Sequence, residues 1–509
     1  MKNIKNMCFL FALILSILSC EKDFEELNTN TVDPTSESVD PVYVLNNAII
    51  GLSFPTGTNI FYDAGVVQQI VTPNSGVVSG ANYNQDNRNN TGDQWDDLYE
   101  NVIKHTGDVI NQVQEIPERS NLYNIARIIE AYAFLVLTDT YGDIPYFEAG
   151  QGFSNQIVLP VYDAQENIYP DLIKELNEAM GALSDSGDVV NEVMYGGDLD
   201  KWRRLGNSLL LRIGMRLSNV DNTLAQQTVQ NAFSGGVMTS NEDNFVVRHD
   251  NNFTNPYGPT FNGTEANNLY LVGAFVDFLS NSNDPRLGAI AIRYVGAASG
   301  PEQILDIATK DPAQQIGMPM GHDNSSIGTE AANLGLASFY DFSQMDRYAL
   351  GANDAPMFLC TYGQTQLLLA EAITNGWVTG DAAASYENGV RAHMEQLGDY
   401  GEETTVATVD IDTYLAVNPF DAGNAVEQIN TQYWVASFLN GPEAFANFRR
   451  SGFPDLTPNP YPGQDITGDF INRLTYPSSE IAVNKANLDA AISRMGADDL
   501  DTKVWWDNQ

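Results

Sequence analysis

The chain has 509 residues, of which 43% are hydrophobic and 10% aromatic, and this composition excludes a largely disordered protein. Its formal net charge is −41, because 66 acidic residues outnumber 25 basic ones. A surface of this sign repels nucleic acid and anionic lipid headgroups, so we expect the protein to bind neither.

The first nineteen residues have the pattern of a signal peptide. Lys2 and Lys5 precede an apolar run that is too short to anchor a protein across a bilayer. The run ends in the string ILSC, which closes at Cys20 and resembles a bacterial lipobox, where the cysteine becomes the first mature residue and carries the lipid. We predict a lipoprotein signal peptide at 1–19 and lipidation of Cys20. The alternative is an ordinary secretory signal with an incidental cysteine.

Residues 20–40 are polar and acidic, and they predict a lipidated, solvated tether. An acidic run directly after the cysteine resembles the export signal that sends Bacteroidota lipoproteins to the outer face of the outer membrane; a plain linker is the alternative. No later apolar stretch has the 18 or so residues that a transmembrane helix requires. The rest of the chain is therefore predicted to be soluble and tethered at one end.

Apolar residues recur with a helical period in windows that form four antiparallel pairs. Paired helices of this length suggest tetratricopeptide-like units, in which each pair stacks on the next to bury its apolar face. We predict an all-α fold, with 41–509 forming a single domain. The paired windows are 93–114 with 122–141, 163–183 with 201–217, 357–375 with 381–397, and 426–439 with 442–450.

Residues 51–92 and 235–355 differ in composition from these windows. They are rich in Gly, Asn, Pro and Ser, with aromatic residues interspersed. Structureless loops of this length are uncommon in compact domains and are usually functional. We expect long irregular binding loops carried by a rigid helical scaffold.

The common catalytic and metal-binding motifs are missing from the sequence. It has four histidines but no HExxH pair, no Gly-Lys dipeptide for a P-loop and no GxSxG elbow. With Cys8 in the signal peptide and Cys20 lipidated, Cys360 remains alone and can form neither a disulfide framework nor a cysteine metal site. We therefore expect neither an enzyme nor a cofactor, and leave a structural calcium ion open.

Four stretches, together with the lipobox, carry a resemblance to a known family. The chain resembles the SusD/RagB-like nutrient-binding outer-membrane lipoproteins of Bacteroidota, in the SusD-like branch that ends in Val-Trp-Trp-Asp. The resemblance extends over nearly the whole chain in the expected order. The stretches are ARIIEAYAFLVLTDTYGDIPYFEA (126–149), DKWRRLGNSLLLRIGMRLS (200–218), FLNGPEAFANFRRSGFPDL (438–456) and AAISRMGADDLDTKVWWD (490–507).

The resemblance implies an α-helical fold with four tetratricopeptide-like pairs and a ligand surface made of the irregular loops. It implies a partner, a SusC-like TonB-dependent transporter over which the lipoprotein closes like a lid, and a lipid-anchored position on the outer membrane facing the cell exterior. Ligands within such families are mostly oligosaccharides and, in some members, peptides. Several conspicuous side chains recur in the resemblance as scaffold, and we expect them to pack or to neutralise carboxylates. They are Trp202, Arg203, Arg204, Arg449, Arg450, Trp505 and Trp506.

Neutral sugars offer apolar C–H faces to aromatic rings and a rim of hydroxyls to amides, carboxylates and arginines. All six tryptophans fall in helical or terminal motifs, so stacking on a sugar would depend on tyrosine and phenylalanine in the loops. We favour capture of a neutral glycan over capture of peptides, which the negative charge would also suit, and over a surface hydrolase. The candidate ligand residues are Tyr62, Asn82, Tyr83, Asn255, Tyr257, Phe261 and Tyr340.

Overall fold

The computed structural model describes residues 39–74, 82–152 and 154–507. The predicted signal peptide, Cys20 and nearly all of the predicted tether lie outside these residues. No helix within the described ranges is long and apolar enough to cross a membrane.

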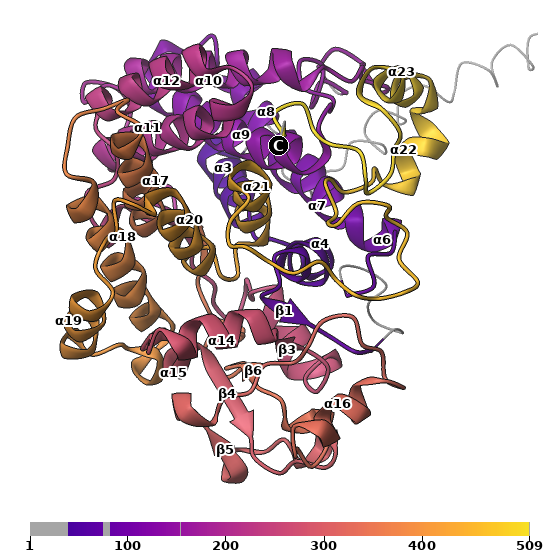
Figure 1. Ribbon diagram of the computed structural model, residues 1–509. Coiled ribbons are helices and arrows are strands. Elements are labelled where there is room, and N and C mark those ends of the chain that lie inside the picture. The colour runs from indigo at the N-terminus through magenta and orange to yellow at the C-terminus, as the bar shows by residue number, and fades with distance from the viewer. Residues whose placement is uncertain (1–38, 75–81, 153, 508–509) are drawn as a thin grey trace, which may run out of the picture.

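Most of the described chain is helical, which confirms the predicted all-α fold. We call the helices before residue 240 and after residue 361 the helical scaffold, and in Figure 1 they lie above and to the left of the remaining chain. Its helices are α3 (Pro41–Ile50), α4 (Thr56–Thr58), α5 (Ala64–Val66), α6 (Arg88–Thr91), α7 (Asp93–Asp97), α8 (Lys104–Val113), α9 (Ser120–Tyr141), α10 (Gln165–Ala182), α11 (Leu199–Arg216), α12 (Asn222–Gly235), α17 (Tyr362–Thr374), α18 (Ala382–Gln396), α19 (Thr408–Val417), α20 (Ala425–Ala436), α21 (Gly441–Ser451), α22 (Ser478–Val483) and α23 (Lys485–Met495).

The predicted helix pairs are in contact in the structure. Helix α8 packs on α9, α10 on α11, α17 on α18, and α20 on α21. Helix α9 lies at the centre, with nearly all of its side chains from Leu122 to Tyr141 buried. A helix that is apolar all round has to be enclosed by others. It ends where Gly142 takes a positive φ of 84°, as the glycine in the sequence predicts.

The structure departs from the predicted windows, and it adds helices outside them, such as α3, α12, α19 and α23. Residues 357–360 form a strand, β7 (Met357–Cys360), instead of the start of a helix, because they pair with β2 (Phe245–Val247). The helix begins only after Thr361, which forms a capping box at its N-terminus. Helix α12, which the sequence analysis did not identify, packs on α11. The window 93–114 contains a π-helical turn, Leu98–Ile103, between α7 and α8.

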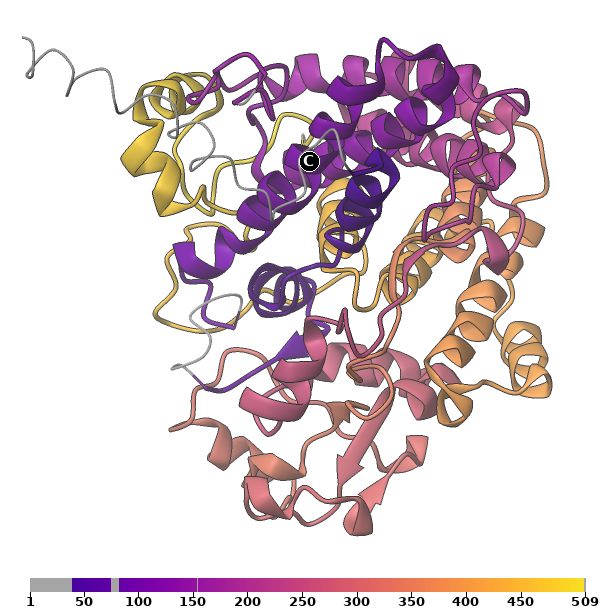
Figure 2. The ribbon, with the colours of Figure 1, turned by 180° about the vertical axis from the view of Figure 1, so that it is seen from behind.

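Residues 260–350 combine irregular segments with short strands and short helices, and we call them the loop lobe. Both views place the lobe below the helical scaffold (Figures 1 and 2). A three-stranded antiparallel sheet of order β5-β4-β6 supports it, and β3 pairs with β1 from the N-terminal part of the chain. The elements of the lobe are β3 (Tyr270–Leu271), α14 (Gly273–Asn281), α15 (Arg286–Ile290), β4 (Ala291–Tyr294), β5 (Ala308–Thr309), α16 (Ile327–Asn333) and β6 (Gln344–Met345). Strand β1 (Ile70–Val71) and the short helix α13 (Tyr257–Pro259) lie outside this range.

The loop lobe is more ordered than the predicted structureless loops. It has two small hydrophobic cores of its own, one around Tyr270 and Phe342 and one around Ile292 and Tyr294. In these cores, aromatic rings such as Tyr270 and Tyr294 pack together with aliphatic side chains such as Val272 and Ile327. This burial explains how a segment with so few helical signals keeps a defined shape.

Candidate functional site

Three of the predicted ligand residues lie in or against the chain that follows β1, and Asn82 joins it to the loop lobe. The Tyr62 hydroxyl donates to the Gln85 carbonyl at 2.6 Å, and Asn82 Nδ2 donates to the His322 carbonyl at 2.9 Å. The Tyr83 hydroxyl also forms a hydrogen bond inside the protein. Burial raises the pKa of Tyr83 to about 12. All three side chains are buried and connect loops to one another.

Three more form a second buried group beside the scaffold. Asn255 Nδ2 donates to the Ala355 carbonyl at 2.9 Å, and the Tyr257 hydroxyl donates to the Leu439 carbonyl at 3.2 Å. The Phe261 ring packs edge-on against Tyr257, with the ring centroids 6.2 Å apart. Because the polar atoms of these residues are already bonded inside the protein, their visible role is to hold the loops in place.

Tyr340 is the predicted ligand residue that keeps part of its ring at the surface. It lies in the loop lobe against the small core of Ile292 and Tyr294. Its ring centroid is 4.1 Å from that of Phe339, which is also half-buried. The structure therefore brings the seven predicted residues to three separate places, and Tyr340 marks the one that faces solvent.

A cluster around Arg347 adjoins Tyr340. The Arg347 guanidinium carbon lies 5.3 Å from the ring centroid of Tyr294 and 5.2 Å from that of Tyr348, so the cation stands between two aromatic faces. Gln303 connects Tyr340 to this cluster: its Nε2 donates to the Tyr340 carbonyl at 2.8 Å, and its own carbonyl accepts from Arg347 Nη2 at 3.2 Å. These contacts fix the rings in place before any ligand arrives.

The surface next to this cluster combines apolar and polar groups. Tyr348 is 46% exposed, and Ile304 and Leu305 are 50% and 61% exposed. Half-buried polar side chains follow on the neighbouring loop, where Asn268 Nδ2 donates to Glu265 Oε2 at 2.7 Å. We call the surface formed by Glu265, Asn267, Asn268, Ile304, Leu305, Tyr340 and Tyr348 the lobe surface. Rings beside amides and a carboxylate match the two kinds of group on a sugar.

Sequence reasoning missed most of the lobe surface. The string SFYDFSQMDRY, residues 338–348, holds Tyr340, Arg347 and Tyr348, and its aromatic density beside an arginine was the available signal. Gln303 carries no such signal, because its role depends on a fold that brings residues 303, 340 and 347 together.

The structure shows no arrangement for metal-dependent chemistry in its described part, where no three His, Cys, Asp or Glu side chains gather closely enough to hold a metal ion. Cys360 is buried in the scaffold, and this burial raises the pKa of its thiol, which opposes nucleophilic use. Binding is the chemistry that the lobe surface supports.

The chain matches a known family and several solved structures. The SusD-like family described as starch-binding and associating with the outer membrane matches residues 33–477. None of the curated proteins matches the sequence. A chitin-binding protein of known structure is 31% identical, with a TM-score of 0.82 over 92% of this chain and 100% of the other.

Two further structures agree with this result. A SusD-like protein described as Bacteroidetes AC2a is 26% identical, with a TM-score of 0.78 over 92% of this chain and 100% of the other. A SusD homologue from Bacteroides uniformis, at 23% identity and a TM-score of 0.74 over 92% of this chain and 99% of the other, shares the fold. The chain therefore belongs to the SusD-like family, whose description is starch-binding and associating with the outer membrane.

Proposed function

We propose that this protein captures a neutral oligosaccharide or polysaccharide at the outer face of the outer membrane and delivers it to a SusC-like TonB-dependent transporter. It does so without cleaving the glycan, anchored through lipid on Cys20. The lobe surface is the observation that carries this proposal, because it presents aromatic rings, amides and a carboxylate on a fixed support. The family description and the resemblance to a chitin-binding protein support a glycan as the ligand.

The mode of binding follows from the groups on the lobe surface. The apolar face of a sugar ring stacks on Tyr348 and Tyr340, and its hydroxyls exchange hydrogen bonds with Glu265, Asn267 and Asn268. Each such hydrogen bond contributes only about 0.5–1.5 kcal/mol net. The affinity for a short oligosaccharide is therefore weak, and repeated contacts along a polymer, or capture by the transporter, supply the rest.

Affinity electrophoresis of the full chain, purified in detergent, tests the proposal. The gels contain starch, laminarin, chitin oligosaccharides, xylan, levan, mannan or alginate. We expect one neutral glycan to retard the protein, equally at low and high salt, because stacking on an uncharged ring involves no ionic attraction. Replacing Tyr348 with Ala should weaken this binding about tenfold through the lost ring contact.

The matched control is Tyr43→Ala, which removes a 69% exposed tyrosine from helix α3 in the scaffold and should leave retardation unchanged. If no glycan retards the protein, and calorimetry instead detects salt-sensitive binding of mixed peptides, the protein captures peptides and the proposal is wrong. Shortening of the bound glycan during the experiment would identify a hydrolase.

A further inference from the structure

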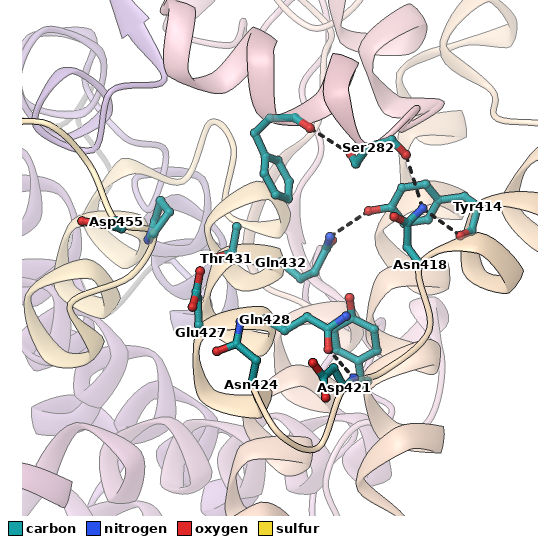
Figure 3. Close-up of a pocket in the computed structure, with 13 residues that line it drawn as sticks. Ser282, Tyr414, Asn418, Asp421, Asn424, Glu427, Gln428, Thr431, Gln432 and Asp455 are labelled. Atoms are coloured by element: carbon teal, nitrogen blue, oxygen red, sulfur yellow. Dashed lines mark hydrogen bonds between the residues drawn. The ribbon is translucent and has the colours of Figure 1, made fainter.

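A cavity of about 400 Å³ opens between α14 and the helical scaffold (Figure 3). Its walls come from α14, α18, α19, α20 and the segment after α21. The volume lies within the usual range of small-molecule sites. None of the predicted ligand residues and no residue of the lobe surface lines it.

One wall of the cavity is held in place by a buried network. Gln432 Nε2 donates to the Tyr414 hydroxyl at 2.9 Å, and Gln432 Oε1 accepts from Arg286 at 2.6 Å. Arg286 is fully buried and forms an ion pair with Asp284, so its positive charge is neutralised within the protein. The wall is therefore preorganised and contributes no net positive charge to the cavity.

Thr431 provides an unused hydrogen-bonding group in the same cavity. Its side chain is only 9% exposed, and in Figure 3 it points into the space between the walls. No protein hydrogen bond is found for its hydroxyl within the described ranges, and the oxygen is not among the fully buried polar atoms, so it reaches the solvent in the cavity. The hydroxyl therefore bonds to water when the cavity is empty, and a hydroxyl of a polar ligand can take the place of that water.

The charges around the cavity all have one sign. Asp421, Glu427 and Asp455 line it, and none of its lining residues is Lys, Arg or His. Amide side chains and the rings of Phe278 and Tyr414 make up much of the remainder. Carboxylates favour a cation, aromatic rings favour a cation or an apolar face, and amides favour hydroxyls.

We propose that this cavity is a second binding site, specific for an amino sugar with a free ammonium group, such as a deacetylated unit within a glycan. The ammonium group lies against Glu427 and Asp455, a ring hydroxyl bonds to Thr431, and the apolar face of the sugar meets the aromatic wall. The inference rests on the proposed function in taking the ligand to be a glycan. A neutral sugar would gain no ionic attraction from the carboxylates, and a lysine side chain has no hydroxyl groups to bond with the amides and Thr431.

Calorimetry on the full chain in detergent tests this site with three probes: the trisaccharide of glucosamine, its fully N-acetylated counterpart, and trilysine. We expect the glucosamine trisaccharide to bind, to bind more weakly at high salt, and to bind better than both other probes. Comparable binding of trilysine would overturn the proposal in favour of peptide capture. Equal binding of the N-acetylated trisaccharide at this site would also overturn it, because the ammonium group would then be unimportant.

Variants locate the binding. The double change Glu427→Gln and Asp455→Asn, at exposed positions, should weaken binding of the glucosamine trisaccharide by about tenfold. Thr431→Val keeps the shape of the side chain and should weaken it by about threefold through the lost hydrogen bond. The control Glu395→Gln removes one negative charge from an exposed position on α18 outside the cavity and should change nothing.

If the cavity variants bind the glucosamine trisaccharide as the parent does, the site is not in this cavity and the proposal fails. Retardation by the neutral glycan provides an independent comparison, because it depends on Tyr348 and should be unaffected by the cavity variants. Loss of glucosamine binding with retained retardation therefore separates this inference from the proposed function.

Discussion

Glu371 and Arg450 form a buried, bidentate ion pair, with both nitrogen–oxygen distances at 2.7 Å. Arg449, next in the chain, donates to the carbonyls of Asp139 and Asn472, and its guanidinium carbon stands 3.8 Å from the centroid of the Phe445 ring. These two arginines could have been taken for ligand-binding groups. Arg450 thus neutralises a carboxylate, and Arg449 packs on a ring and bonds to backbone carbonyls, so both serve the scaffold as expected.

Asp63 is a buried carboxyl group with a different environment. Neither of its oxygens has a hydrogen-bond partner among the described residues, and burial raises its pKa well above the ordinary value of 3.8, although the charge of Arg449 partly opposes this. The folded protein therefore keeps this proton at pH values where the unfolded chain has released it. Stability is lost as the pH rises from 3.8 toward the raised pKa.

We predict that Asp63→Asn removes this loss. The variant should match the parent near pH 3 and exceed its free energy of unfolding at neutral pH, with the difference growing by about 1.4 kcal/mol per pH unit over that window. Urea unfolding at a series of pH values measures it. Asp185→Asn, at an exposed position, is the control, and a difference between parent and Asp63→Asn that does not vary with pH would contradict the prediction.

At the scale of elements, the close approach of helices depends on residues without side chains. Gly214 of α11 faces α12, and a methyl group added there would lie 2.7 Å from Val229 Cγ2 and 3.1 Å from the Ala225 carbonyl oxygen. Gly181, near the end of α10, has no atom within 4 Å of the same position. Gly214 therefore permits the close contact between α11 and α12, whereas no neighbouring element approaches Gly181 closely.

The two glycines give opposite predictions. Gly214→Ala should lower the free energy of unfolding by about 1–3 kcal/mol, because α12 has to move away from α11. Gly181→Ala should raise it by about 0.5–1 kcal/mol, because alanine loses less backbone entropy in a helix. Chemical unfolding followed by circular dichroism measures both, and equal effects of the two changes would show that α11 and α12 are packed less closely than described.

At the scale of the whole molecule, the last described residues connect helices from distant parts of the sequence. Trp506 is fully buried, and its Nε1 donates to Asp139 Oδ1 of α9 at 2.9 Å. The guanidinium carbons of Arg216 and Arg449 lie 5.5 Å and 4.9 Å from its ring centroid. A single ring thus joins α9, α11 and α21 in the helical scaffold.

We predict that Trp506→Ala lowers the free energy of unfolding by about 3–5 kcal/mol, because a large cavity opens and Asp139 loses a donor. Trp505→Ala is the matched comparison, since the neighbouring ring is only half-buried, and it should cost about 1 kcal/mol. Thermal and urea unfolding would measure the two variants. Similar losses of stability for both variants would contradict the prediction. They would mean that the backbone of the C-terminal segment, and not the Trp506 ring, holds this segment on the scaffold.

The sequence alone determined the paired helices of the scaffold. Apolar residues spaced at 3.6 positions identify the windows that became α8 to α11, α17, α18, α20 and α21, and this signal is local. Gly142 predicted the end of α9, and this signal is local as well. The family resemblance is likewise carried by the sequence, because most of its motifs lie in this scaffold.

Only the tertiary structure decided which loop residues face solvent. Tyr257 and Tyr340 both lie in the stretch 235–355 that the sequence predicts to be irregular, yet the first is buried with its hydroxyl on the Leu439 carbonyl and the second keeps part of its ring exposed. Residues 357–360 became a strand only because β2 lies beside them. Burial and strand pairing depend on partners that lie tens to hundreds of residues away, and no local pattern in the sequence encodes them.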